Sequence, residues 1–303
     1  MSYRPTHRQL EYIAALDELR HFGKAAKRCH VSQPTLSVQV GLVERNLGVT
    51  LFERTSSTVM STPIGVEVAR RARLALASLD DLVSLAAQDS TLLGGLIRLG
   101  TAPSFGPYFL PHFLPDLHRT FPDLKLYIRE DRPAAIESAV AEGVLDCGLG
   151  PAPELPGLTF HRIGDERIHL GVPADHALAS NVSTAMRALC GERLLALGSG
   201  HRLLDNVRHL ADASGAHLVD DYEGTSLDAI RQMVSMGMGL SLFPELYARA
   251  EFRNADDVKL LNIGDWAERR EVGFFWRENS GRGRHYRVLA EKADVTARKL
   301  MIA

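Results

Sequence analysis

Residues 22–54 read FGKAAKRCHVSQPTLSVQVGLVERNLGVTLFER, and their pattern predicts two helices joined by a tight turn. Gly23 is expected to cap the first, short helix, and Val31 is expected to end it. One face of that helix consists of the small residues Ala25, Ala26 and Cys29. Because small side chains let two helices approach closely, this face is predicted to pack against its neighbour.

The second helix of the pair has clear start and stop signals. Ser32 is a good N-cap, and Pro34 falls in the first turn, where a missing N–H costs little. Gly48 is placed to end the helix. Apolar residues recur at steps of four, three and four, at Leu36, Val40, Val43 and Leu47. This spacing predicts one stripe that packs into a core.

The opposite face of the second helix is polar near its start and carries little charge. Short and mid-length polar side chains suit hydrogen bonds to base edges and phosphates, so the pair is a candidate helix-turn-helix that binds DNA. The predicted contact residues are Ser32, Gln33, Pro34, Thr35, Ser37, Val38 and Gln39. Val38 is expected either to meet a thymine methyl group or to touch nothing.

Two further elements complete the predicted N-terminal fold. A helix over residues 6–19 has an apolar face that would pack under the second helix of the pair, formed by Leu10, Ile13, Ala14 and Leu16. After Gly48, residues 49–54 and 59–62 alternate weakly in hydropathy around the tetrapeptide TSST, which is typical of the two strands of a wing. The pattern therefore indicates a winged helix-turn-helix.

A long helix is predicted over residues 64–87, after Thr62 as the cap and Pro63 as the first helical residue. Its apolar residues alternate steps of four and three, as in a coiled-coil seam, at Val68, Ala72, Ala75, Leu79, Leu82 and Ala86. The helix would span roughly 36 Å. It is either an ordinary surface helix or a dimerisation linker, and the linker is favoured because pairing presents two recognition helices to a palindromic site. Residues 88–95 are the expected hinge.

From residue 96 onward, short apolar strands alternate with helices. The first half predicts strands at 96–99, 124–128 and 144–149 and helices at 109–120 and 136–142. The second half predicts strands at 168–172, 193–197 and 240–243 and helices at 203–213 and 227–236, before strand 272–276 and a helix from residue 286 return to the first half. This alternation indicates an α/β domain with parallel sheets, whose ligand would bind between the halves at the carboxyl ends of strands.

The stretch AAKRCHVSQPTLSVQVGLVERNLGVTLFERT resembles the N-terminal domain of the LysR-type transcriptional regulators, and the resemblance covers nearly the whole chain. Later stretches are most similar to the OxyR branch and its LsrB/VtlR-type paralogues: TAPSFGPYFLPHFLPDLHRTFPDLKLYIRE, GVLDCGLG, LALGSGHRLLDNV and TSLDAIRQMVSMGMGLSLFP. In the family a basic residue at the wing tip usually enters the minor groove. Ser57 stands there in this chain, which leaves Arg54 and Ser56 as the expected contacts of the wing.

The resemblance implies a fold that is α+β overall. Residues 1–62 would form the winged helix-turn-helix, residues 63–90 the linker and dimerisation helix, and residues 91–303 a two-lobed, periplasmic-binding-protein-like α/β effector domain. Lobe I would hold about 91–165 and 269–303, and lobe II about 166–268. The resemblance also implies double-stranded promoter DNA and a small-molecule effector as partners, self-association to a homotetramer, and RNA polymerase as a further partner.

Eight residues are predicted to form the effector site: Thr101, Ser104, Glu130, Arg132, Gly200, His201, Arg202 and Thr225. Thr101 and Ser104 come between a strand and a helix, so they would cradle an anion or polar ligand, or simply cap the helix. Glu130 and Arg132 end another strand and could equally be solvated charges. The resemblance assigns the set to an effector pocket, where Arg202 would suit an anionic ligand.

The cysteines bear on an alternative function, thiol-based redox sensing. In OxyR, the segment matching GSGHRLLDNVRHLADASG carries a peroxide-reactive cysteine directly after the histidine and its disulfide partner nine residues later. Arg202 and Ala211 stand at these positions, so the resemblance implies a regulator without the OxyR cysteine pair. Cys29 and Cys147 are expected to be inert core thiols, and Cys190 has an arginine three residues on that could lower its pKa. A redox response would have to use Cys147 or Cys190.

Composition and charge exclude some classes of protein. A hydrophobic content of 45% and a charged content of 24% are ordinary for a soluble protein. No apolar run approaches the roughly 20 residues of a membrane span, and no signal peptide is recognised, so a cytoplasmic protein without a membrane partner is expected. Residues 1–58 hold eight Lys/Arg against five Asp/Glu, and residues 59–303 hold 27 against 32. This uneven distribution of charge either arises by chance or marks residues 1–58 as a basic segment that suits DNA binding.

A third class is an enzyme or a solute-binding protein, because a two-lobed α/β fold can host either. A periplasmic carrier would need a signal peptide. The histidines show neither metal spacing nor a nucleophile motif, and three scattered cysteines do not predict a zinc site. We therefore expect no cofactor, no metal and no catalytic residue, but a regulator whose effector domain biases the spacing of its DNA-binding heads.

Overall fold

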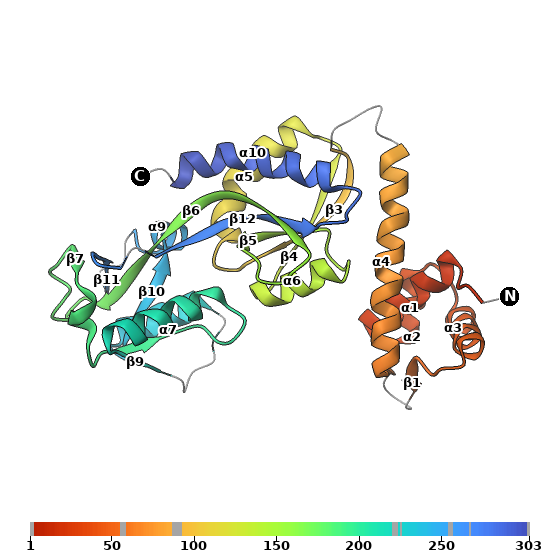
Figure 1. Cartoon of the computed structure of the whole chain (residues 1–303), viewed down its shortest axis with the longest axis horizontal. Helices are drawn as coiled ribbons and strands as arrows, with labels where there is room; N and C mark the ends of the chain where they lie inside the picture. The colour runs from red at the N-terminus through yellow and green to blue at the C-terminus, as the bar shows by residue number, and fades with distance from the viewer. Residues whose placement is uncertain are drawn as a thin grey trace. The chain divides into compact units, whose positions relative to one another are not determined.

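The computed structural model describes residues 3–54, 59–86, 93–219, 224, 226–253, 257–266 and 268–301 (Figure 1). The chain forms two compact units. The first comprises residues 1–90, 142–144 and 280–282, and the second comprises residues 91–141, 145–279 and 283–303. None of the described helices combines the length and the apolar character that a membrane span requires.

The first unit contains the winged helix-turn-helix. Its elements are α1 (His7–Leu19), α2 (Phe22–Arg28), α3 (Gln33–Leu47), β1 (Phe52–Arg54), β2 (Val59–Ser61) and α4 (Pro63–Ala86). The apolar faces of α1 and α3 meet in one core, in which Ile13, Leu16, Leu36, Val40 and Val43 are fully buried or nearly so. β1 and β2 pair antiparallel as the predicted wing. The sequence-based prediction of this fold is confirmed.

Three local expectations in this unit were wrong. His21, not Gly23, is the N-cap of α2, because its Nδ1 accepts hydrogen bonds from the N–H groups of Gly23 and Lys24 at 3.1 and 3.3 Å. α2 ends at Arg28, before the expected Val31. Leu47 is exposed, so the buried stripe of α3 stops at Val43.

Helix α4 has two parts with different surroundings. It begins at Pro63, and the Oγ1 atom of Thr62 accepts a hydrogen bond from the N–H of Gly65 at 3.0 Å, as a cap does. In its first half Ala69 and Ala72 are buried, and α4 packs on α1. In its second half Leu79 and Leu82 are exposed, and Leu82 leaves 61% of its surface to solvent. The first half therefore packs on its own domain, while the second presents an apolar seam.

The second unit contains two hydrophobic cores, which define two lobes. Lobe I is built from β3 (Gly95–Thr101), α5 (Gly106–Thr120), β4 (Leu124–Glu130), α6 (Pro133–Ala141), β5 (Cys147–Pro151) and α10 (Gly283–Met301). β4, β3 and β5 lie parallel and in that order. Helices α5 and α10 pack together on one face of this sheet, and α6 lies on the other (Figure 1).

Lobe II surrounds the second core. Its elements are β7 (Ser183–Thr184), the 3₁₀ turn Met186–Leu189, β8 (Arg193–Leu195), α7 (Arg202–Ser214), β9 (His217–Leu218), α8 (Leu227–Ser235), β10 (Leu240–Pro244), α9 (Glu245–Glu251) and β11 (Val258–Ile263). β8 pairs parallel with both β10 and β9. In the described part of the chain, strands therefore alternate with helices in both lobes.

Two long strands, β6 (Leu158–Pro173) and β12 (Arg269–Arg277), join the lobes. The first part of β6 pairs antiparallel with β12, and its second part pairs antiparallel with β10 and β11 of lobe II. β12 also pairs antiparallel with β5 of lobe I. The expected parallel strands are present in each lobe, and the antiparallel crossing strands β6 and β12 link the two parallel groups in one mixed sheet.

Candidate functional site

The start of α3 is held by a side-chain cap. The Oγ atom of Ser32 accepts a hydrogen bond from the N–H of Thr35 at 3.2 Å, and the two hydroxyl oxygens lie 2.8 Å apart. Pro34 occupies the first turn, as predicted. Ser32, Pro34 and Thr35 all remain exposed. The cap therefore fixes the first turn of α3 and leaves its surface accessible.

The predicted contact face of α3 is open in its first two turns. Gln33 and Val38 are exposed, Val38 to 63%, and Ser37 is half-buried. Gln33 and Ser37 are four residues apart, so they lie on the same face of the helix. Gln39 is half-buried, and its Oε1 accepts a hydrogen bond from Gln9 Nε2 of α1 at 3.0 Å. Gln39 thus also ties α3 to α1.

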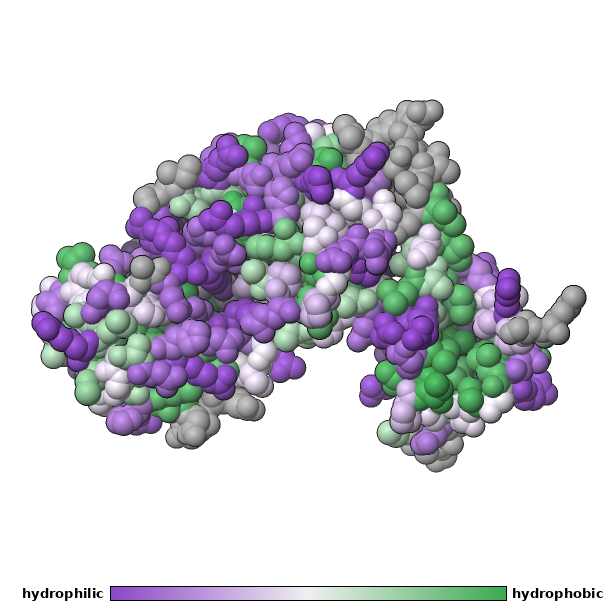
Figure 2. All heavy atoms as spheres, viewed as in Figure 1, coloured by the Kyte–Doolittle hydropathy of each residue, from purple (hydrophilic) through white to green (hydrophobic). Residues whose placement is uncertain are grey.

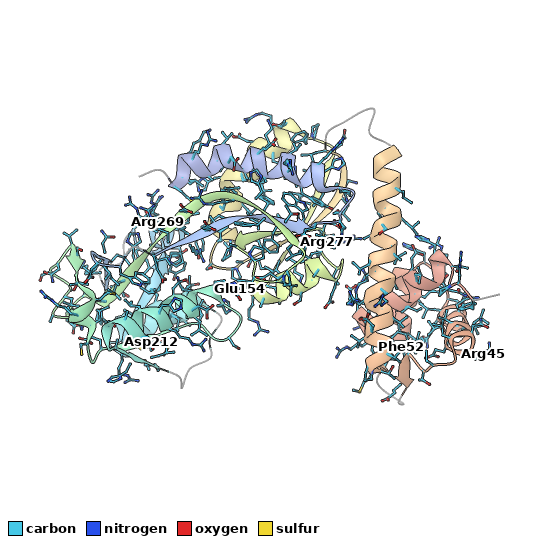
Figure 3. All side chains as sticks on the ribbon, in the orientation of Figure 1. Arg45, Phe52, Glu154, Asp212, Arg269 and Arg277 are labelled. Atoms are coloured by element: carbon cyan, nitrogen blue, oxygen red, sulfur yellow. The ribbon has the colours of Figure 1, made fainter. Side chains whose placement is uncertain are left out.

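The wing is anchored to α3 by one carboxylate. The Oε1 atom of Glu44 accepts hydrogen bonds from the N–H groups of Leu51 and Phe52 at 2.9 and 3.1 Å. Figure 3 shows Phe52 on β1 and Arg45 near the end of α3. Arg54 ends β1, but its side chain and the whole of Ser56 lie outside the described residues.

A cavity of about 220 Å³ opens between the two lobes of the second unit. Lobe I contributes residues around the start of α5 and the end of β4, and lobe II contributes residues before α7, at the start of α8 and in α9. The lining residues are Pro103, Ser104, Pro107, Tyr108, Glu130, Leu197, His201, Ser226, Leu227, Asp228 and Tyr247. This cavity lies where the sequence predicted a ligand between the halves.

The cavity brings together three of the predicted effector residues, Ser104, Glu130 and His201. Arg132 and Gly200 lie close to His201 and join the lobes. Arg132 Nη1 donates to the carbonyl oxygen of Ser199 at 3.3 Å, and the N–H of Ala134 donates to that of Gly200 at 3.4 Å. Gly200 has a φ of +85°, a conformation that glycine adopts readily. Thr225 lies outside the described residues.

Thr101 and Arg202 do not line the cavity. Thr101 is fully buried, and a Cβ at Gly106 would lie 2.2 Å from its Oγ1, so its side chain faces the start of α5. Arg202 instead bonds two carboxylates of lobe I: its Nη2 donates to Glu137 Oε1 at 2.6 Å, and its Nη1 lies 2.6 Å from Glu154 Oε2. Figure 3 labels Glu154 in this region. The guanidinium of Arg202, which was expected to bind an anionic ligand, is therefore already bound to these two carboxylates.

A buried ion pair supports the lobe I wall of the cavity. Arg270 of β12 donates from Nε to Glu166 Oε2 of β6 at 2.7 Å, and both side chains are almost completely buried. Its Nη1 and Nη2 donate to the Oγ and the carbonyl oxygen of Ser104, both at 2.8 Å. Glu166 Oε1 in turn accepts from the N–H of Leu246 at the start of α9 at 2.8 Å. The crossing strands therefore hold Ser104 in place.

The remaining polar groups of the cavity are neutral or acidic. The hydroxyl of Tyr247 donates to Asp228 Oδ1 at 2.8 Å. Burial raises the pKa of Tyr247 and of Tyr108, and nearby carboxylates raise both further, so both phenols keep their protons. Burial, and then the charge of Arg132, lower the pKa of His201, which favours the neutral imidazole.

The three cysteines are free thiols. Cys147 is fully buried in β5. Cys29 is buried, its Sγ lies 3.9 Å from the carbonyl oxygen of Glu11, and its burial raises the thiol pKa. Cys190 is exposed just after the 3₁₀ turn of lobe II. In the part of the chain that the structure describes, no three His, Cys, Asp or Glu side chains are grouped as a metal site would need.

Sequence reasoning missed most of the apolar and aromatic lining. Tyr108 and Tyr247 are far apart in the sequence, and no local spacing relates them. Pro103 and Pro107 are close to Ser104 in the sequence, so the prediction of Ser104 could have included them. Asp228 follows Thr225 by three residues in the first turn of a predicted helix, where an acidic residue is ordinarily explained by the helix dipole.

Both parts of the chain match models of known protein families. Residues 7–66 match the bacterial regulatory helix-turn-helix protein of the lysR family. Residues 90–294 match the LysR substrate binding domain. These two matches include α1 to α3 with the wing, and all the described residues that line the cavity.

Similar proteins include peroxide-response regulators. The chain is 38% identical over 285 residues to the DNA-binding transcriptional dual regulator OxyR of Escherichia coli K12, covering 94% of this chain and 93% of that protein. It is 33% identical over 292 residues to a probable hydrogen peroxide-inducible genes activator of Mycobacterium leprae, covering 96% and 94%. A full-length OxyR variant from Pseudomonas aeruginosa has a similar structure, with a TM-score of 0.82 at 31% identity over 99% and 97% of the two chains. The chain belongs to the LysR family of transcription regulators and is similar to its OxyR-like members.

Proposed function

We propose that this regulator binds promoter DNA through the exposed face of α3 and responds to a small molecule in the cavity between its lobes. The observation that carries the proposal is the origin of the cavity walls: Ser104 and Glu130 come from lobe I, and Leu197, His201 and Asp228 from lobe II. A ligand that contacts both lobes favours one arrangement of them over another. Binding energy can thereby shift a conformational equilibrium.

On this proposal, residues 1–62 read the DNA, residues 63–90 pair two chains, and residues 91–303 hold the effector. The exposed seam around Leu79 and Leu82 supports pairing through the second half of α4. Figure 2 shows hydrophobic side chains along α4 in this view. Pairing would place two copies of α3 on one palindromic site, and a pair of pairs would extend the contact with the promoter. RNA polymerase would be a further partner, and no enzymatic turnover is expected.

Gln33→Ala and Ser37→Ala should each weaken specific DNA binding by about 1–3 kcal/mol, because each removes a side chain that can read a base edge. The measurement is the affinity for a specific site relative to random DNA of equal length, at fixed salt. Gln232→Ala is the matched control, since Gln232 is exposed on α8 of the second unit. An unchanged affinity ratio in the α3 variants would contradict base reading by these residues.

The function is tested by footprinting the full chain on the intergenic DNA beside its own gene, in reductant and after mild peroxide. The expected result is an extended protection that peroxide leaves unchanged. Extended protection requires more than one DNA-binding head. A short protection covering one half-site would contradict the tetramer, and a protection that changes with peroxide would contradict control by a ligand alone.

Thiol-based sensing is a second candidate because several relatives are named as hydrogen peroxide-inducible activators and because Cys190 is exposed. If peroxide shortens or shifts the footprint, Cys190→Ser should abolish that change, since an accessible thiolate is the reactive form. Cys147→Ser tests the buried thiol separately, and Cys29→Ser is the matched control in the DNA-binding unit. A peroxide response that survives in Cys147→Ser/Cys190→Ser would exclude both thiols.

A further inference from the structure

The charged lining of the cavity between the lobes is entirely acidic among the described residues. Glu130 and Asp228 are its two charged side chains, and no lysine or arginine belongs to the lining. The other lining residues are serines, tyrosines, prolines, leucines and His201. The two carboxylates would therefore repel an anionic ligand in the cavity. They would attract a cationic ligand.

Neither carboxylate is neutralised by a cation in the described chain. The side chain of Glu130, at the end of β4, is exposed and forms no hydrogen bond or ion pair with another described residue. Asp228 accepts one hydrogen bond at Oδ1 from the hydroxyl of Tyr247, which carries no charge. Its other oxygen, Oδ2, stays available as an acceptor.

Three arginines near the cavity lining, Arg132, Arg231 and Arg270, are bound to other groups, and Arg231 pairs with Asp257. Arg132 donates its Nη1 to the carbonyl oxygen of Ser199. Arg270 is paired with Glu166, and its remaining donors are used by Ser104. None of these arginines lines the cavity. The guanidinium groups of this region therefore donate hydrogen bonds to protein atoms.

A buried, unpartnered acceptor adds to the two carboxylates. His201 lines the cavity and is only 4% exposed, yet its Nε2 has no hydrogen-bond partner in the described chain. Its lowered pKa, caused first by burial and then by Arg132, favours the neutral imidazole. A neutral imidazole can accept a hydrogen bond at Nε2. A buried polar atom without a partner is costly, so a ligand N–H that supplied one would be stabilised.

The aromatic lining also suits a cation. The rings of Tyr108 and Tyr247 pack edge to face with centroids 5.4 Å apart. Aromatic faces attract organic cations, and most strongly where water is displaced. Leu197, Leu227, Pro103 and Pro107 supply apolar surface for a hydrocarbon part. At about 220 Å³ the cavity is smaller than the roughly 300–1,000 Å³ that holds a drug-sized ligand.

We propose that the effector of this cavity is a small organic cation, an alkyl ammonium or guanidinium compound with a short hydrocarbon part, held by Glu130, Asp228 and His201. The inference rests on the proposed effector function and names its ligand class. It replaces the sequence-based expectations that Thr101 and Ser104 cradle an anion or polar ligand and that Arg202 holds an anionic one. Ser104 lines the cavity, whereas Thr101 and Arg202 do not.

The test compares three probes of equal length and different charge on the purified full chain at constant ionic strength: pentylammonium, pentanamide and pentanoate. Calorimetric titration should give binding of pentylammonium that is at least about tenfold tighter than that of the other two, as a charge-assisted hydrogen bond provides. Glu130→Gln and Asp228→Asn should each weaken pentylammonium binding by about tenfold and leave pentanamide binding unchanged.

Asp205→Asn is the matched control, because Asp205 is also an acidic residue in the first turn of a lobe II helix and does not line the cavity. It should leave all three affinities unchanged. An equal loss in this control would overturn the assignment, since it would show a diffuse charge effect. The unfolding midpoint of each variant, measured without ligand, verifies that the fold is retained.

The remaining outcomes separate this inference from the proposed function. Tighter binding of pentanoate or pentanamide, lost on Tyr108→Ala, would overturn the cationic class and keep the cavity as the effector site. Failure of all three probes to bind would overturn the cationic class and leave the proposed effector function to its own footprinting test. Footprinting of the same samples would still report the DNA-binding role independently.

Discussion

Replacing Arg270 by methionine lowers the free energy of unfolding of the second unit by about 3–5 kcal/mol. The side chain of Glu166 is completely buried, so removal of the guanidinium leaves a charge without compensation in the interior. The hydroxyl and the carbonyl oxygen of Ser104 lose their donors in the same step. The loss therefore combines an unpaired buried charge with two unsatisfied acceptors.

Urea denaturation followed by tryptophan fluorescence measures this effect. Both tryptophans, Trp266 and Trp276, belong to the second unit, so the signal reports on that unit. A matched double variant, Glu166→Gln/Arg270→Met, should recover at least about 1 kcal/mol, because it removes the stranded charge and keeps an acceptor for the N–H of Leu246. A double variant no more stable than Arg270→Met would contradict the charge-based explanation.

Arg202→Gln should lower the free energy of unfolding by about 2 kcal/mol. The effect is smaller than at Arg270, because Glu137 keeps two hydrogen bonds at Oε2 from the N–H groups of Glu154 and Leu155, each at 3.1 Å. The exposed carboxylate of Glu154 adds little. The ion pair joins α7 of lobe II to α6 of lobe I. The same substitution should therefore also weaken the contact between the two lobes.

Arg208→Gln serves as the matched control for Arg202→Gln. Arg208 is on the same helix and, among the described residues, pairs only with the half-exposed Asp205, so its loss should change stability by no more than about 0.5 kcal/mol. A double-mutant cycle of Arg202→Gln with Glu137→Gln then isolates the pair. A coupling energy near zero would show that the ion pair does not contribute to holding the lobes.

The N-terminal fold was predictable because its signals are local. Ser32, Pro34 and Gly48 mark the ends of α3 through effects that act within one helical turn. The error at α2 has a local cause of another kind. The imidazole of His21 accepts the hydrogen bonds that the side chain of a serine or aspartate usually accepts, and glycine, unlike histidine, is among the preferred residues at such a position.

The crossing strands and the cavity depend on contacts between distant residues. Only residues 168–172 of β6 were predicted, since the earlier part of that strand carries polar and charged side chains that find partners elsewhere. Glu166 is buried because Arg270, about one hundred residues later, pairs with it. The cavity was located through the family resemblance, while the orientation of Thr101 and the pairing of Arg202 required the three-dimensional contacts.

The double connection through β6 and β12 has a mechanical consequence. The lobes are joined by a hydrogen-bonded antiparallel ribbon, so the two connecting strands cannot stretch or slide past one another without breaking their ladder. A ribbon twists and flexes across its thin dimension more easily than it shears in its plane. The pairing shifts register between Val272 and Gly273, where such an irregularity bends a strand. Motion of one lobe against the other is therefore expected to be mainly a rotation about the ribbon, and a ligand between the lobes would act on that rotation.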